Sequence, residues 1–370
     1  MIVEKGVNVY DVAVIGAGIN GCSVAHFLTK IGKKVALFDK ESIAAGGSGA
    51  AGAFISPKFS KGGELKELIE KSYLFSLDFY AQNFPSFLKK APLLHIAKEE
   101  FDAKKLRAFK ENTTLGIAKT PLHVSQILTK EAQQNENVYL LSGGIVDAQG
   151  VCRAMAEGSD IFEYEVKNLV WQDGYYEVGD IKAKEVVLAY GAYEPIIQEP
   201  YINLRGIWGH RIDIKTSTRT EVTMHHHVSI SKCEDGNMAI GATHNVHYHP
   251  QKNAEPYDIN EGRAELLNKA NLTIELKNVE ILKDYTGLRS GSNDYLPLIG
   301  RMVENKNSAD EPSYYPNLTM INGVGGYGFV LAPYIAKQLC DFIVDGKEVD
   351  AFLMPLRFYK RYRKGLSKGR

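Results

Sequence analysis

A strand–turn–helix–strand unit near the N-terminus constrains the fold of this chain most strongly. Residues 10–15 (Y-D-V-A-V-I) are almost wholly apolar, which is typical of a strand buried on both faces of a parallel sheet. They lead into G-A-G-I-N-G, an amphipathic helical stretch closed by Gly32, and a second apolar strand at 34–38. This order predicts a nucleotide-binding α/β domain of the Rossmann type.

The G-x-G-x-x-G motif predicts that this domain binds a dinucleotide. Gly16 permits the tight turn, Gly18 lets the backbone approach a pyrophosphate, and Gly21 lets the helix pack on the strand. The positive helix N-terminus suits a diphosphate. Asp39 lies 23 residues after Gly16, where an acid can accept hydrogen bonds from a ribose. The expected cofactor contacts from this unit are Gly16, Gly18, Ile19, Asn20, Gly21, Asp39 and Lys40.

The rest of the chain predicts a second, inserted domain. A length of 370 residues is too great for one simple core. Strand-like stretches within 206–250 alternate polar and apolar residues, which indicates an antiparallel sheet. Residues 284–300 are rich in glycine and are expected to form turns. We therefore expect an α/β fold with a nucleotide-binding domain at 1–83, 141–205 and 285–370, and an α+β substrate domain at 84–140 and 206–284.

Charge and cysteine usage exclude several classes of protein. Basic and acidic residues balance at 44 each, so the surface as a whole does not favour nucleic acid or membrane, although a local patch could. The four scattered cysteines lack a C-x-x-C pair, which argues against a disulfide framework or structural zinc. The N-terminus has no signal-peptide pattern, and glycines and a proline break the apolar stretch 318–344. The sequence predicts a cytoplasmic protein without a membrane span.

Histidines gather between residues 225 and 249, where six of the ten occur. A metal site needs a closed ligand set with fixed spacing, and no carboxylate or cysteine completes one here. We expect no metal site, and we expect most of these histidines to form a polar face of the substrate sheet. His244, at the end of a predicted strand, could border a substrate cavity.

Five segments together resemble the D-amino-acid oxidase/glycine oxidase superfamily of FAD-dependent amine oxidoreductases. They are V-I-G-A-G-I-N-G (14–21), G-G-S-G with G-A-F (46–54), V-V-L-A-Y-G-A-Y (186–193), G-L-R-S-G-S-N-D-Y-L-P-L-I-G (287–300) and N-G-V-G-G-Y-G-F-V-L-A-P (322–333). The resemblance implies that the nucleotide-binding domain holds FAD and that the enzyme oxidises CH–NH groups. The further cofactor contacts expected are Gly47, Ser48, Gly52, Ala53, Phe54, Val166, Gly191, Arg289, Gly325, Gly326, Tyr327, Gly328 and Phe329.

The same resemblance implies how a substrate would be held. Arg289, in the G-L-R segment, matches the carboxylate-binding arginine of the superfamily, and a planar guanidinium suits a carboxylate. The alternative is a structural salt bridge. The helix that begins near Gly328 can stabilise negative charge on reduced flavin. Tyr327 has two possible roles: its hydroxyl donates a hydrogen bond to the substrate carboxylate, or its ring only packs against neighbouring side chains.

Two stretches are most similar to the oxidoreductase half of the bifunctional enzymes of tRNA 5-methylaminomethyl-2-thiouridine biosynthesis. These are residues 47–61 and the basic C-terminal segment, although Ala50 and Ala51 replace the usual polar residues. The similarity implies oxidation of a glycine-like side chain on a wobble uridine. Since the methyltransferase half is absent, we expect a stand-alone oxidoreductase with a separate methyltransferase partner. The alternatives are an oxidase or dehydrogenase of free glycine, sarcosine or D-amino acids, and a flavin-binding protein without turnover.

The C-terminal segment Arg357–Arg370 holds seven basic residues and no acid, interleaved with Phe358, Tyr359 and Tyr362. Cations meet phosphates and aromatic rings meet unstacked bases, so this composition suits RNA. We expect a tRNA contact here. The alternative is a solvated helix end or a disordered tail.

Overall fold

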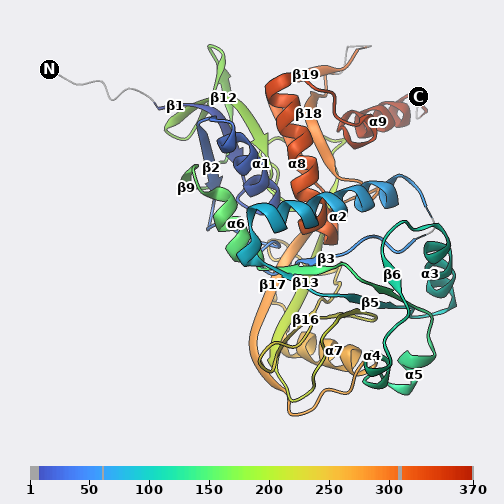
Figure 1. Cartoon of the computed structure of the whole chain (residues 1–370). Helices are drawn as coiled ribbons and strands as arrows, with labels where there is room; N and C mark the ends of the chain where they lie inside the picture. The colour runs from blue at the N-terminus through green and yellow to red at the C-terminus, as the bar shows by residue number, and fades with distance from the viewer. Residues whose placement is uncertain (1–7, 61, 307–310, 369–370) are drawn as a thin grey trace.

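The computed structural model describes residues 8–60, 62–306 and 311–368. Residues 1–7, Lys61 and Arg370, on which parts of the predictions above rest, lie outside these ranges. The chain forms two β-rich units, and α2 (Glu64–Asn83) runs between them (Figure 1). The predicted class, an α/β fold with a parallel sheet and a second unit built on an antiparallel sheet, is confirmed.

The first unit is built on an eight-stranded mixed sheet. Its parallel centre runs in the order β9, β2, β1, β12 and β19, with β18 antiparallel at one edge and β11 and β10 extending from β12. These strands are β1 (Val9–Ile15), β2 (Val35–Asp39), β9 (Asp160–Glu163), β10 (Val170–Gln172), β11 (Tyr175–Val178), β12 (Ile181–Leu188), β18 (Leu298–Glu304) and β19 (Ser313–Asn322).

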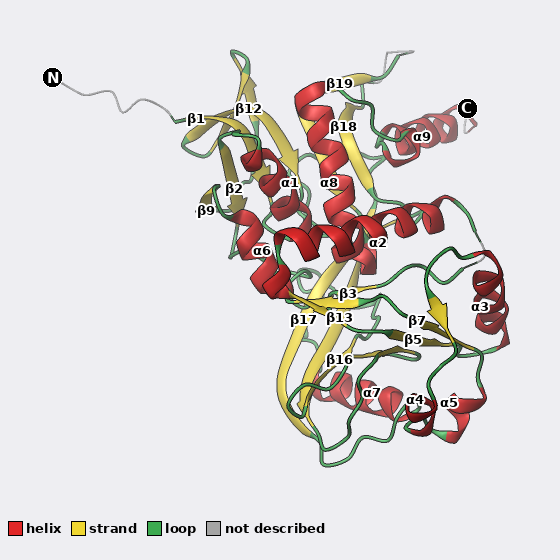
Figure 2. Cartoon of the chain, in the orientation of Figure 1, coloured by secondary structure: helices red, strands yellow, loops and turns green. Residues whose placement is uncertain are grey.

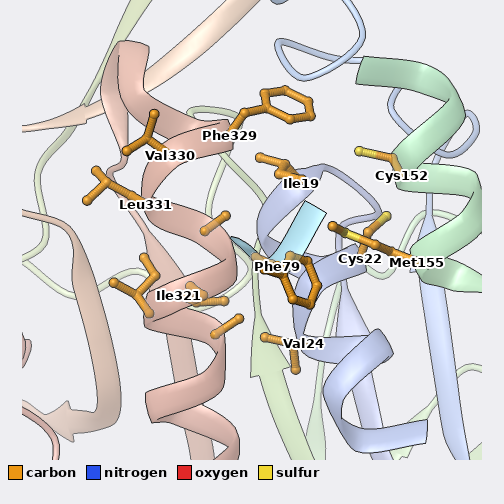
Figure 3. Packing of buried hydrophobic residues seen from close by; sticks show 14 of the residues in the cluster. Ile19, Cys22, Val24, Phe79, Cys152, Met155, Ile321, Phe329, Val330 and Leu331 are labelled. Atoms are coloured by element: carbon orange, nitrogen blue, oxygen red, sulfur yellow. The ribbon is translucent and has the colours of Figure 1, made fainter. Parts of the chain in front are cut away.

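The sheet is buried on both faces at β1, as the apolar run of that strand predicts. Val12 and Val14 point into one hydrophobic cluster, whereas Ala13 and Ile15 point into another, because alternate residues face opposite sides. Figure 3 shows the first cluster, where side chains from α2, α1 (Ile19–Lys30), α6 (Ala148–Ala156) and α8 (Gly328–Asp345) pack together. The second cluster includes residues of α9 (Leu356–Lys368).

The second unit is built on another eight-stranded sheet, which is mostly antiparallel (Figure 2). Its strand order is β17 (Glu280–Ser292), β13 (Leu204–Lys215), β16 (Asn237–Gly241), β15 (Ser229–Ile230), β14 (Thr223–His225), β5 (Leu93–Ile96), β7 (Asn137–Leu140) and β6 (Ile117–Ala118). The helices of this unit are α3 (Glu100–Asn112), α4 (Leu122–Gln126), α5 (Lys130–Gln134) and α7 (Ile259–Asn271). A small sheet of β3 (Phe54–Ile55), β8 (Gly144–Val146) and β4 (Leu88–Lys90) lies between the units.

The prediction of turns from residue 284 is wrong as far as Ser292. These residues continue β17, which pairs with β13 from Glu280 opposite Lys215 to Ser292 opposite Leu204. The glycines leave the strand intact because a long partner supplies its hydrogen bonds and because other chain segments pack closely against it. The predicted domain boundary at residue 285 therefore falls inside β17. The remaining domain division stays a prediction.

The C-terminal segment is neither disordered nor wholly solvated in its described part. It forms α9, whose Phe358 and Tyr359 are buried in the second cluster, with Tyr359 packed edge-on to Tyr201 at 5.5 Å between ring centroids. These two rings are thus unavailable to RNA bases, and that part of the expectation is wrong. In the described parts of the chain, no helix is long and apolar enough to cross a bilayer.

Candidate cofactor and substrate site

A cavity of about 380 Å³ is lined by loops of the mixed sheet on one side and by strands of the antiparallel sheet on the other. Most residues predicted for the cofactor meet in its wall, although Gly16 and Phe329 stand at opposite ends of the chain. Those found there are Gly16, Gly18, Ile19, Asn20, Asp39, Lys40, Gly47, Ser48, Gly52, Ala53, Phe54, Val166, Gly191, Arg289, Gly325, Gly326, Gly328 and Phe329.

The turn after β1 packs so closely on neighbouring backbone that Gly16 leaves no room for a side chain. Gly16 has φ +107°, and a Cβ there would lie 2.5 Å from the carbonyl oxygen of Ala189. Gly21 is not part of the cavity wall; a Cβ there would lie 1.9 Å from the carbonyl oxygen of Gly16, so it serves helix packing. The Ile19 amide donates to Ser48 Oγ at 2.9 Å. With no acid in its first turn, α1 directs an uncompensated positive end at the cavity.

Asp39 closes one end of this wall as a fixed acceptor. Its Oδ2 accepts from the Ala17 amide at 2.8 Å, and its Oδ1 accepts from the Glu41 amide at 3.1 Å. Each carboxylate oxygen retains a further acceptor site, which fits the two hydroxyls of a ribose. Lys40 lies beside it, with Nζ 4.4 Å from the ring centroid of Tyr193. The donor and acceptor set at this end fits the adenosine half of a dinucleotide.

A second helix start meets the first at the cavity. The turn Gly325–Tyr327 leads into α8, which also has no acid in its first turn. Ile19 and Phe329 lie near each other at the two helix starts (Figure 3), and Gly328 approaches Ile19 so closely that a Cβ would lie 3.3 Å from its Cγ2. Two positive helix ends therefore border one cavity, which favours an anionic group between them.

Arg289 extends from β17 into the cavity wall. Burial lowers the pKa of its guanidinium. No residue in the described part of the chain forms an ion pair with it. The missing side chain of Gly209 on β13 makes room for the guanidinium, because a Cβ there would lie 2.4 Å from Arg289 Nη2. A half-buried charged group without an acidic partner in a cavity wall favours an anionic ligand.

A hydrogen-bond network that includes the buried residues Thr243 and His210 positions Arg289. Arg289 Nη1 donates to the Thr243 carbonyl oxygen at 3.1 Å. Thr243 is bonded twice to the backbone of His210, whose Nε2 lies 2.9 Å from Asp284 Oδ1. Arg263 then holds Asp284 through both carboxylate oxygens. His210 is wholly buried, so this network fixes the position of the carbonyl that Arg289 uses.

Two predicted substrate residues lie outside the cavity wall. Tyr327 packs against the first hydrophobic cluster, which agrees with the packing alternative, and Lys58 Nζ lies 5.7 Å from its ring centroid. His244 is exposed, and desolvation and, to a smaller extent, the charge of Arg289 lower its pKa. It therefore stands near the arginine, at the outer side.

Two histidines of the cluster, His225 and His226, do not contribute to the expected polar face. His226 is buried and bonds Thr273 Oγ1 at 3.0 Å. Burial lowers the pKa of His225 to about 4, and its ring packs edge-on to Phe54 at 5.2 Å between centroids. His225 is thus a neutral support behind a cavity residue. Within the described ranges, no group of three histidine, cysteine or acidic side chains is placed to hold a metal.

Several residues of the site were missed from the sequence. Asn322 donates from Nδ2 to the Gly191 carbonyl oxygen at 2.9 Å and accepts from the Gly323 amide at 2.8 Å, so it ties two predicted loops together. Its place directly before the glycine turn was the available signal. Gly209 and Thr243 gave no local signal, because their roles arise from strand pairing. The other unpredicted wall residues include Ser229, Gly241, Ala242, Gln251 and Ser290.

Comparisons with known proteins agree with this geometry. The chain is 25% identical over 356 residues to the tRNA 5-methylaminomethyl-2-thiouridine biosynthesis bifunctional protein MnmC of Marinobacter nauticus, covering 90% of this chain but only 55% of that protein. It is 24% identical to the glycine oxidase of Bacillus licheniformis, covering 90% of this chain and 93% of that protein. The crystal structure of glycine oxidase from Bacillus cereus ATCC 14579 has the same fold, with a TM-score of 0.76, 23% identity, and coverage of 92% of this chain and 96% of that one.

The family assignment rests on most of the chain. The family model described as FAD dependent oxidoreductase (DAO) matches residues 11–342, from within β1 to the last turn of α8. The glycine turn of β1, the acid at Asp39 and the two helix starts fit the cofactor of that family. The chain therefore belongs to the DAO family of FAD-dependent oxidoreductases, with FAD as its cofactor.

Proposed function

We propose that this enzyme oxidises a secondary amine that carries a carboxymethyl group. The specific substrate is the glycine-like side chain of carboxymethylaminomethyl(thio)uridine at the wobble position of tRNA. The observation that carries the proposal is Arg289, a half-buried guanidinium in the cavity wall without an acidic partner among the described residues. A substrate carboxylate would supply the missing negative charge through two parallel hydrogen bonds.

Bound FAD supplies the two-electron oxidant, and water then splits the oxidised C–N bond to release glyoxylate and leave an aminomethyl group. The residues of the chain bind the substrate and orient it. Arg289 holds the carboxylate, and its link to Thr243 sets the direction of the guanidinium. The N-termini of α1 and α8 provide positive potential for the negative charges of the cofactor, which are its diphosphate and the reduced flavin. The buried lining around Ala53 and Leu288 keeps bulk water from the reacting carbon.

The likeness to the MnmC proteins and the basic residues of α9 support a tRNA-borne substrate. Lys360, Arg361 and Lys364 are exposed on this helix, and its sequence contains no acid. Phosphate contacts of this kind provide affinity without reading sequence. We propose further that a separate methyltransferase acts on the product and that the enzyme works in the cytoplasm, where tRNA is modified.

Free amino acids form the second candidate substrate class. The chain spans 93% of the length of a glycine oxidase, whereas it spans about half of the MnmC proteins. The same arginine would bind the carboxylate of glycine, sarcosine or a D-amino acid. The two candidates differ in what the amine is attached to, not in how the carboxylate is held.

Anaerobic reduction of the bound flavin separates the two candidates. Hypomodified tRNA that carries carboxymethylaminomethyl(thio)uridine should bleach the flavin absorbance and yield glyoxylate. Fully modified tRNA, which lacks the carboxymethyl group, is the matched control and should not. Bleaching by glycine, sarcosine or D-alanine but not by hypomodified tRNA would replace the first candidate by the second.

A further inference from the structure

Tyr295 presents an aromatic ring to solvent just beyond the end of β17. It is 68% exposed, and its backbone is held at φ 63°, in the left-handed region that non-glycine residues seldom adopt. This backbone conformation is unfavourable for a large side chain, and an exposed ring gains no burial in return. Such a residue is a candidate for binding something outside the chain.

Hydrogen bonds to the neighbours Asp294 and Leu296 order the turn that carries Tyr295. Asp294 accepts hydrogen bonds from Ser292 Oγ at 3.1 Å and from the Leu296 amide at 3.3 Å. Arg357 of α9 binds both carboxylate oxygens of Asp294, at 3.0 and 3.1 Å, and also the Leu296 carbonyl oxygen at 2.8 Å. The ring is therefore presented by an ordered turn, so a partner would lose little entropy in ordering it.

Arg205 lies beside this ring and close along the paired strands to the cavity residue Arg289. Its guanidinium lies 5.7 Å from the ring centroid of Tyr295 and is exposed. On the paired strands, Arg205 lies opposite Gly291 and Ile207 lies opposite Arg289. Residues directly opposite share one face of a sheet, so Arg205 and Arg289 point to the same side, about 7 Å apart along the strands. This is a separation that one nucleotide step of an extended strand can span.

The exposed side of α9 continues the surface with positive charge. Arg361 Nη2 lies 3.5 Å from Asp294 Oδ2 and is 62% exposed at its side chain. Lys360 is exposed next to it. Asp294 is the acid at the centre of this surface, and it is already held by Arg357 and Arg361. The resulting surface, formed by Arg205, Tyr295, Lys360 and Arg361, combines one platform ring with three exposed cations.

We propose that this surface binds single-stranded RNA next to the nucleotide whose side chain enters the cavity. A base stacks on Tyr295 with Arg205 at the edge, and Lys360 and Arg361 hold the adjoining phosphates. The inference rests on the proposed function for the identity of the RNA, the anticodon loop of tRNA. A protein would need a broader apolar contact than one ring, whereas a base fits a single exposed tyrosine flanked by arginine.

Binding of a fluorescein-labelled anticodon stem-loop RNA without modified bases tests the surface directly, by fluorescence anisotropy. Tyr295→Ala should weaken binding by about tenfold or more, because stacking on an aromatic ring is lost. Tyr295→Phe keeps the ring and should bind as the wild type does. Lys360→Gln and Arg361→Gln should each reduce the slope of log K against log salt by about 0.7.

A matched control exists on α3. Phe101 is 64% exposed with Lys105 Nζ 3.9 Å from its ring centroid, an exposed ring–cation pair away from the proposed surface. Phe101→Ala should leave RNA binding unchanged. Equal losses for Phe101→Ala and Tyr295→Ala would show non-specific binding and overturn the inference.

Flavin reduction separates failure of the surface from failure of the proposed function. Tyr295→Ala should lower kcat/KM for hypomodified tRNA by the same factor as its loss of RNA affinity, while reduction by a free N-substituted glycine stays unchanged. If hypomodified tRNA bleaches the wild type and Tyr295→Ala binds RNA normally, the surface is wrong and the function stands. If the wild type binds the RNA through Tyr295 but no tRNA bleaches it, the function is wrong. If Tyr295→Ala binds RNA normally but no longer binds a purified methyltransferase that the wild type binds, the surface serves a protein partner and the inference is overturned.

Discussion

Arg289 donates a hydrogen bond from Nη1 to the carbonyl oxygen of Thr243 at 3.1 Å, and this contact connects the cavity to the interior of the antiparallel sheet. Thr243 is itself held by His210. Its amide donates to the His210 carbonyl oxygen at 3.0 Å, and its Oγ1 accepts from the His210 amide at 2.9 Å. Thr243 is 1% exposed and His210 is wholly buried, so neither group can exchange its partner for water.

Thr243→Val should therefore loosen Arg289 without touching the ligand itself. The substitution keeps the shape but leaves the buried His210 amide without an acceptor, which costs about 1–3 kcal/mol of unfolding free energy. We expect a higher KM for the carboxylate substrate together with a lower midpoint in denaturant. Thr243→Ser retains the hydroxyl and should restore both values. An unchanged KM in Thr243→Val would show that Thr243 does not position Arg289 for substrate binding.

Arg289→Gln should raise KM strongly while FAD remains bound. Removing the cation leaves a desolvated substrate carboxylate without its counter-charge, which costs about 2–5 kcal/mol, or roughly 30-fold to several thousandfold in affinity. Arg289→Lys keeps the charge but cannot bind a carboxylate in a bidentate way. Its KM should therefore lie between those of Arg289→Gln and the wild type. Steady-state kinetics and the flavin spectrum measure both effects. Wild-type flavin reduction in Arg289→Gln would refute the assigned role.

Gly209→Ala should impair binding of the substrate carboxylate, because the added methyl group displaces Arg289. The added Cβ would lie 2.4 Å from Arg289 Nη2, so the guanidinium must leave its place. Gly291→Ala is a matched control on the same face, since its nearest neighbour, Ile207 Cδ1, would be 3.4 Å away. We expect about a tenfold or greater rise in KM for Gly209→Ala only, from a 1–3 kcal/mol overpacking cost. Equal KM values in the two variants would contradict the placement of Arg289.

Asp39→Ala should release FAD. The carboxylate receives the amides of Ala17 and Glu41 and would hold the ribose hydroxyls. Losing hydrogen bonds to a charged acceptor should weaken FAD binding by about 10- to 100-fold. The ratio of flavin to protein absorbance after dialysis measures the loss. Asp39→Glu preserves the charge and should keep more flavin; a fully loaded alanine variant would remove Asp39 from the cofactor site.

Asp294→Asn should destabilise the protein in a pH-dependent way. Burial alone would raise the pKa of Asp294, but the hydrogen bonds and charge of Arg357 hold it below its ordinary value. A carboxylate with a depressed pKa in the folded state stabilises above its unfolded pKa, near 4, and loses this contribution as pH falls through the folded value. We expect a deficit of about 1–3 kcal/mol at pH 7 that shrinks below about pH 4, measured by urea unfolding. A deficit independent of pH would exclude the ion pair as its cause.

The sequence alone determined the nucleotide-binding half of this protein, because its signals are local. The burial of Val12 and Ala13 on opposite faces of the sheet follows from an apolar run, and the need for glycine at Gly16 and Gly21 follows from a turn that excludes side chains. The acid at Asp39 follows from the fixed length of one helix and two connections. The five motif segments carried the family resemblance in the same way.

The tertiary structure alone decided how the substrate side is built. Gly287–Ser292 read as turns but form a strand, since β13, some 80 residues earlier, supplies the hydrogen bonds. Gly209 and Thr243 acquire roles only because that pairing and its neighbours bring them to Arg289. Phe358 reads as a ring for RNA but is buried, while Tyr295 is exposed. Local patterns set backbone conformation, whereas burial and partners of a side chain depend on segments far away in the chain.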